Sequence, residues 1–212
     1  MTPPPPPNSK RVGRIGRDSR TGAARGGVLA GVTPIPPQSV VCAPVNVIDE
    51  LLANTEAFAA SMPVQHLDVR PRRRLAVVTC MDSRLDVFAA LGLHHGEAHI
   101  LRNAGGVITD DVIRSLAVSQ RRLRTREVML IHHTDCGMQS LTDDGFRAEL
   151  QEASGLAPAF AIESFTDLDA DVRQSLRRVR RSPFLLHRDC VRGFVYDVDT
   201  HVLREVHADA PE

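Results

Sequence analysis

Short runs of hydrophobic residues alternate along the chain with longer amphipathic stretches. Three of the short runs have the length and composition of buried strands. They cover residues 75–80, 96–102 and 127–131. The longer stretches have the apolar spacing, capping residues or length of helices. They cover residues 47–60, 85–91, 109–124, 142–153 and 167–181.

The order of these elements predicts the fold class. Buried strands that alternate with helices are typical of a parallel sheet with crossover helices. Residues 191–198 and 201–206 alternate between polar and apolar side chains on either side of Asp199 and Thr200, which predicts a terminal hairpin. We therefore expect an α/β fold with a mostly parallel central sheet flanked by helices, an N-terminal helix, and a late edge strand or hairpin.

The first 45 residues differ in composition from the rest of the chain. Residues 3–7 are all proline, glycines and arginines follow, and three more prolines stand at positions 34, 36 and 37. Such a segment buries too little apolar surface to offset its chain entropy. We predict a disordered tail at residues 1–45 and one folded domain at residues 46–212, an ordinary length for a domain.

Composition and charge narrow the class of protein. Of 212 residues, 42% are hydrophobic and 25% are charged, and the tail's arginines are spaced rather than clustered, so nothing indicates nucleic-acid binding. No apolar run approaches the roughly 18–20 residues of a membrane span. The four cysteines are too sparse for the disulfide framework of a small secreted domain. We expect a soluble cytoplasmic protein with reduced thiols that binds neither nucleic acid nor membranes.

Chemically reactive residues gather where two of the predicted strands end. Cys80 closes the run at residues 75–80 and precedes Asp82 and Arg84, while His133 and Cys136 follow the run at 127–131. Because the carboxyl ends of parallel strands meet at one edge of a sheet, we expect these side chains to come together. Two thiols and an imidazole can bind zinc, and three protein ligands plus water make a catalytic zinc site.

Two roles are open to Asp82. Because it stands two residues after Cys80, it can accept a hydrogen bond from a water on the metal, or it can become the fourth ligand of a closed structural site. A different class of function is a thiol enzyme without metal, in which Cys80 or Cys136 is the nucleophile.

Other residues compete for the role of ligand. His132 precedes His133, but alternation along a strand points the side chain of His132 to the opposite face. His187 and Cys190 repeat the spacing of His133 and Cys136. Only Cys42, near the tail, remains to complete a second site, so we interpret His187 and Cys190 as structural.

Three motifs together resemble the β-class carbonic anhydrases. They are Cys-Met-Asp-Ser-Arg at residues 80–84, Arg-Asn-Ala-Gly at 102–105 and His-Thr-Asp-Cys-Gly at 133–137, and they stand in the family's order and spacing. The similarity extends from about residue 46 to the terminal hairpin, where Val-Arg-Gly-Phe-Val-Tyr-Asp occupies residues 191–197. Three motifs in register are far more specific than a single His-x-x-Cys.

The resemblance implies a site and a reaction. It implies that Cys80, His133 and Cys136 bind Zn²⁺, and that Asp82 and Arg84 form the dyad that orients the zinc-bound water. The implied reaction is the reversible hydration of carbon dioxide to bicarbonate and a proton by zinc-bound hydroxide. Relatives that hydrolyse carbon disulfide or carbonyl sulfide share this kind of site, so those substrates stay open, as does a non-catalytic zinc protein with Asp82 as fourth ligand.

The resemblance also implies an assembly. Because the family generally builds its site at a dimer interface, we expect a homodimer or a dimer of dimers, with the helix at residues 47–60 as an arm across the partner. The chain has no tryptophan. That absence excludes the form of regulatory bicarbonate pocket that some members build with this residue.

Overall fold

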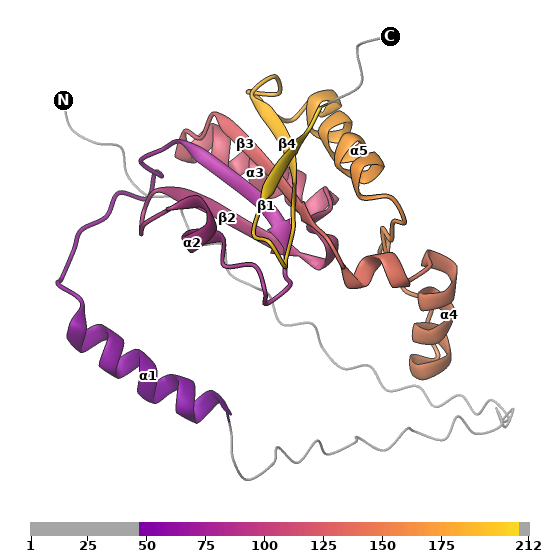
Figure 1. The fold of residues 1–212 in the computed structure, drawn as a ribbon, viewed down its shortest axis with the longest axis horizontal. Coiled ribbons are helices and arrows are strands. Elements are labelled where there is room, and N and C mark those ends of the chain that lie inside the picture. Colours follow the sequence, from indigo (N-terminus) through magenta and orange to yellow (C-terminus); the bar gives the residue numbers. More distant parts are fainter. Residues whose placement is uncertain (1–46, 208–212) are drawn as a thin grey trace, which may run out of the picture. The chain divides into compact units, whose positions relative to one another are not determined.

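The structure, a computed structural model, describes residues 47–207 (Figure 1). The predicted tail at residues 1–45 lies outside the described residues. The chain divides into two compact units, Met1–Met62 and Pro63–Glu212. None of the described helices has the length and hydrophobicity needed to cross a membrane.

The described part of the first unit is the N-terminal helix α1, Val47–Ser61. Its first turn carries Asp49 and Glu50, whose negative charges favour the amino end of a helix. No residue of α1 is buried, although Leu51, Leu52 and other apolar side chains recur along it. The sequence prediction of an N-terminal helix is confirmed, and its apolar side chains lack a buried environment within this unit.

The second unit is built on a five-stranded sheet with the order β2-β1-β3-β4-β5. The first four strands pair in parallel, and β5 pairs antiparallel with β4. The strands are β1 (Leu75–Cys80), β2 (Ala98–Asn103), β3 (Glu127–His133), β4 (Val191–Tyr196) and β5 (Leu203–Val206). This arrangement confirms the predicted mostly parallel sheet with a late antiparallel edge.

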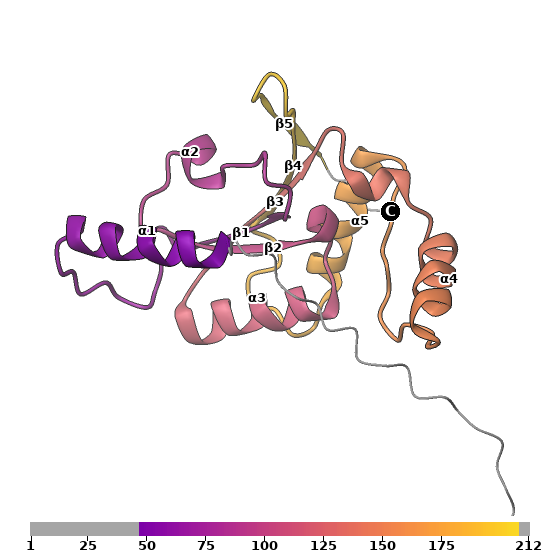
Figure 2. The ribbon, with the colours of Figure 1, turned by 90° about the horizontal axis from the view of Figure 1, so that it is seen from below.

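Helices cover both faces of this sheet. Helices α3 and α5 lie on one face and the short helix α2 on the other (Figure 2). The helices of this unit are α2 (Val87–Leu91), α3 (Asp110–Leu123), α4 (Asp143–Ser154) and α5 (Leu168–Arg181), with 3₁₀ turns η1 (Ala104–Gly106) and η2 (Gly137–Ser140). Side chains of Thr109, Thr142 and Asp167 accept hydrogen bonds from the first turns of α3, α4 and α5, which fixes where these helices begin.

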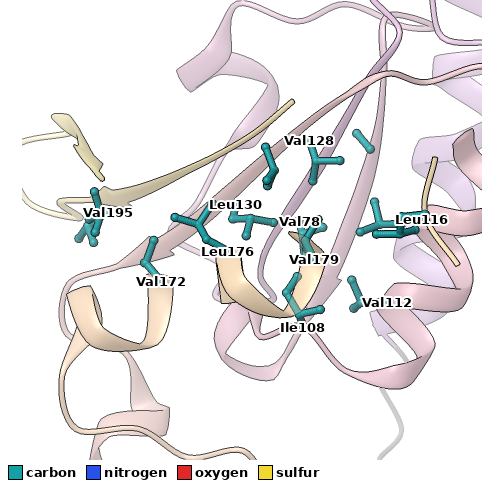
Figure 3. Close-up of a cluster of buried hydrophobic side chains, with 14 residues drawn as sticks. Val78, Ile108, Val112, Leu116, Val128, Leu130, Val172, Leu176, Val179 and Val195 are labelled. Carbon is teal, nitrogen blue, oxygen red and sulfur yellow. The ribbon is translucent and has the colours of Figure 1, made fainter. Parts of the chain in front are cut away.

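The larger hydrophobic core fills the space between the sheet and helices α3 and α5 (Figure 3). Alternate residues of the strands point into it, and the apolar stripes of the two helices face them. Its fully or almost fully buried members include Val78, Leu130, Ile108, Leu116, Val172, Leu176 and Val179. Helix α5 packs closely against β4 at Gly193, where a Cβ would lie 2.4 Å from a methyl group of Val172.

Several local features differ from the prediction. The helix expected at residues 85–91 begins at Val87, because the Asp86 side chain accepts a hydrogen bond from the Ala89 amide and caps the helix there. Strand β3 continues to His133, two residues past the predicted end, because β4 runs beside it as far as Tyr196. The 3₁₀ turns η1 and η2 were not predicted.

Candidate metal centre

Three side chains from two strand ends converge in the second unit. Cys80 is the last residue of β1, His133 is the last residue of β3, and Cys136 lies in the turn that follows. Their ligand atoms all lie within 4.8 Å of one another, and the two sulfur atoms are 4.0 Å apart. All three side chains are buried. Within residues 47–207 no other group of histidine, cysteine and carboxylate side chains is arranged in this way.

Two residues with positive φ, Asp135 and Gly106, shape the backbone around the cluster. Asp135 adopts a left-handed conformation (φ 53°), which turns the chain sharply between His133 and Cys136. Gly106 packs against the backbone of β1, where a Cβ would lie 2.8 Å from the Cys80 nitrogen, and its φ of 71° also favours glycine. Any larger residue at position 106 would push Cys80 out of place.

The orientation of His133 is set by its backbone contact. Its Nδ1–H donates a hydrogen bond of 2.9 Å to the Thr134 carbonyl, which leaves the lone pair on Nε2. That Nε2 is buried and has no hydrogen-bond partner. A buried polar atom without a partner is costly, and this one lies beside two sulfur atoms, so the three side chains can each offer an electron pair to one ion.

The pKa values of the two thiols are shifted in opposite directions. The hydrogen bond from Cys136 lowers the pKa of Cys80 to about 4, against the opposing effect of burial. The same hydrogen bond, with burial, raises the pKa of Cys136. The metal-free pair therefore holds a single proton near neutral pH, and a bound cation would displace it.

Asp82 and Arg84 form a tight ion pair at the edge of the cluster. Nε and Nη2 of Arg84 donate to the two carboxylate oxygens of Asp82 over 3.0 and 2.8 Å. This guanidinium holds the pKa of the Asp82 carboxyl well below its usual range. Asp82 Oδ2 lies 3.8 Å from Nε2 of His133, so the carboxylate stays ionised next to the point where the three ligand atoms converge.

Two thiols and an imidazole nitrogen fit a transition-metal ion. Thiolate and imidazole are the ligands of tetrahedral four-coordinate sites, and three of them leave one coordination position for a reactant. Apolar side chains of Val107, Met138, Ile162 and Phe165 pack with the two cysteines and keep bulk water from the thiols.

Comparison with known proteins decides the family. A family model described as carbonic anhydrase matches residues 75–181. β-Carbonic anhydrase 1 of Mycobacterium tuberculosis is 51% identical over 162 residues, which is 76% of this chain and 99% of that protein. This chain belongs to the β-carbonic anhydrase family.

Other members agree with this assignment. The crystal structure of a carbonic anhydrase from Streptococcus mutans superposes with a TM-score of 0.73 at 41% identity and covers 77% of this chain and 99% of that one. A carbon disulfide hydrolase of Saccharolobus solfataricus is more distant, at 34% identity over 64% of this chain and 78% of that protein. The predicted resemblance to β-carbonic anhydrases and the predicted fold are confirmed.

The other candidate ligands lie outside the convergent group. His132 points away from the cluster, where its Nε2 bonds Asp171 of α5 over 2.6 Å and its ring lies against Phe165. Cys190 is exposed, and Cys42 lies outside the described residues.

Sequence reasoning overlooked one residue at this site. Asp135 accepts a hydrogen bond of 2.7 Å from Nη1 of Arg84, and the Asp135 carbonyl accepts another of 2.9 Å from Nη2. Arg84 therefore ties the loop after β1 to the turn after β3. The available signal was an acid between His133 and Cys136, at the same sheet edge as an arginine two residues beyond Asp82.

The thiol pair generates a testable prediction for the metal-free protein. Because the pKa of Cys80 is lowered to about 4, Cys80 should be a thiolate at neutral pH and should lose that charge only as the pH falls through about 4. The ultraviolet absorbance of thiolates, compared between the wild type and Cys80→Ala, measures this titration. Cys136→Ala should move it to higher pH because the donor is lost, whereas Cys190→Ala should not. Titration of Cys80 near the ordinary thiol pKa of roughly 8.5 would contradict this assignment.

Proposed function

We propose that this chain binds one zinc ion through Cys80, His133 and Cys136 and catalyses the reversible hydration of carbon dioxide to bicarbonate and a proton. The observation that carries the proposal is the unpartnered, buried Nε2 of His133 beside two sulfur atoms, with the ionised Asp82 at its edge. Family membership independently supports the reaction.

The donor set favours zinc over other ions. Two thiolates balance the charge of a divalent cation, and soft sulfur ligands exclude magnesium and calcium. Zinc in such a site supplies a Lewis acid that makes a water molecule nucleophilic near neutral pH.

Asp82 acts as an orienting acceptor rather than as a proton store. Its pKa is held well below the usual range, so the carboxylate stays ionised at neutral pH and is too weak a base to retain a proton. Arg84 occupies both carboxylate oxygens, which keeps Asp82 from turning onto the metal as a fourth ligand. The remaining lone pairs of Asp82 can accept a hydrogen bond from the attacking water and aim it.

The surroundings of the cluster suit a small uncharged substrate. Val107, Met138, Ile162 and Phe165 form an apolar wall beside the two sulfur atoms. Carbon dioxide has no net charge or dipole and can lie against such a wall, while bicarbonate, being charged, is expelled more readily. Nothing in the described residues favours carbon disulfide or carbonyl sulfide, and the 51% identical relative is a carbonic anhydrase.

The functional unit that we propose is a homodimer, alone or within a dimer of dimers. Strand β2 is an edge of the described sheet, and an open groove beside it is lined by Phe88, Ile100, Val118 and other side chains of α2, β2 and α3. Phe88 and Val118 are 42% and 46% exposed. A second copy would cover this groove, and the apolar side chains of α1 would find a buried place on the partner.

The extent of the domain, residues 46–212, and the cytoplasmic location stay predictions.

The catalytic assignment predicts separate effects for ligand and acceptor variants. Asp82→Asn should keep its zinc and its thermal stability but hydrate carbon dioxide on the order of 10²-fold more slowly in a stopped-flow assay, because it loses a charged acceptor. Cys136→Ser should lose zinc, because a hydroxyl does not replace a thiolate near neutral pH. The matched control is Asp144→Asn, an exposed acid in the first turn of α4. A wild-type rate in Asp82→Asn would refute the role of the carboxylate.

The assembly can be tested by light scattering. We expect the full chain to have the mass of at least two copies, and a glutamate at Leu51 of α1 or at Val118 of the groove to shift the population towards monomers, because each would bury a charge. Leu156→Glu, at a 75% exposed leucine near α4, should leave the mass unchanged. A monomeric wild type at all concentrations would exclude the proposed dimer.

A further inference from the structure

The loop between β1 and α2 carries two functional residues but has few hydrogen bonds of its own. The Met81 amide donates to the Asn103 carbonyl over 2.8 Å, and the Leu85 amide donates to the Asp82 carbonyl over 3.1 Å. Neither bond reaches the carbonyls of Cys80 or Leu85. Carbonyl groups at the end of a strand need partners from elsewhere, because the ladder no longer supplies them.

Arg102 supplies those partners from the neighbouring strand β2. Its Nε donates to the Cys80 carbonyl over 2.9 Å, its Nη2 to the Asp82 carbonyl over 2.6 Å, and its Nη1 to the Leu85 carbonyl over 3.2 Å. One guanidinium therefore bonds the end of β1 and two residues of the loop that follows it. A planar group with five fixed donors can do this, whereas the single ammonium of lysine cannot.

We propose that Arg102 is a positioning residue that fixes where the Asp82 carboxylate lies relative to the three metal-binding side chains, an inference that rests on the proposed function. It acts through the backbone: the carbonyl it holds most closely belongs to Asp82 itself. Arg84 fixes the rotation of the carboxylate, and Arg102 fixes the peptide that carries it. Misplacement of a reacting group by about 1 Å can cost on the order of 10²-fold in rate.

The main test compares Arg102→Ala with Arg114→Ala, an exposed arginine of α3 that pairs with Asp111. We expect Arg102→Ala to keep its zinc and to lose kcat on the order of 10²-fold with little change in KM, because the apolar wall is untouched. Because Arg102 is exposed to solvent, free guanidinium at a concentration below that which unfolds the protein should restore part of the lost kcat. Sodium chloride and urea at the same concentration should not.

A second readout needs neither zinc nor activity. In the metal-free protein, the amides of Arg84 and Leu85 should exchange their hydrogens faster in Arg102→Ala than in the wild type, since the loop opens more often. Arg114→Ala should exchange like the wild type. This readout also separates the two hypotheses: a wild type that does not hydrate carbon dioxide overturns the proposed function, while the exchange rates still decide whether Arg102 holds the loop.

Other outcomes would overturn the role of Arg102. One such outcome is a wild-type kcat in Arg102→Ala. Another is a reduced kcat that free guanidinium does not restore, together with unchanged hydrogen exchange in the loop. If Arg102→Ala fails to fold, Arg102→Lys is the second variant, because lysine keeps the positive charge but not the planar set of donors. We expect Arg102→Lys to lose kcat as well, and full activity in it would show that charge alone suffices.

Discussion

The parallel pairing of β1 with β3 is the constraint on which the site depends. The two strands run side by side in a fixed register, from Leu75 opposite Glu127 to Thr79 opposite Ile131, so their carboxyl ends bring Cys80 and His133 together. Strands rise about 3.3 Å per residue, so a slip of one residue would move Cys80 by roughly 3.3 Å and turn its side chain to the other face of the sheet. The hydrophobic core between the sheet and helices α3 and α5 stabilises this register, because Val78 and Leu130 must both point into it. The packing of the core therefore fixes the relative positions of Cys80 and His133 at the candidate metal centre.

Beyond the strand ends, hydrogen bonds between strands no longer hold the backbone in place, and arginine side chains hold it instead. Arg84 joins Asp82 to the Asp135 turn, and Arg102 holds the carbonyls of the loop that carries Asp82. Each guanidinium offers five donors in one plane, so a single side chain can tie several segments of irregular backbone. The acceptors are carboxylates and carbonyls, whose bonds to a charged donor are stronger than those between neutral groups. The same bonds that order the loops keep Asp82 ionised and turned towards its proposed role.

Local patterns in the sequence determine most of the elements, but not the contacts between them. The helix beginning at Asp110 is predictable because Thr109 caps it and apolar residues repeat along it. The helix expected from Leu85 begins two residues later, since the choice between two nearby starting points depends on which side chain caps the turn, here that of Asp86. The ligands could be proposed because each stands at the end of an apolar run. The contacts of Asp135 and Arg102 could not be proposed, because the partner of Asp135 lies 51 residues away and those of Arg102 lie 17 to 22 residues away, and they become neighbours only through the sheet.

The central claim is that two thiolates and one imidazole from two strand ends hold one zinc ion. X-ray absorption at the zinc edge of the purified protein tests it most directly, because sulfur and nitrogen neighbours differ in distance from the metal, roughly 2.3 against 2.0–2.1 Å. We predict two sulfur ligands and one imidazole per zinc in the wild type, and a sulfur count that falls to one in whatever metal Cys80→Ala retains. A zinc environment without sulfur, or an unchanged sulfur count in Cys80→Ala, would contradict the account.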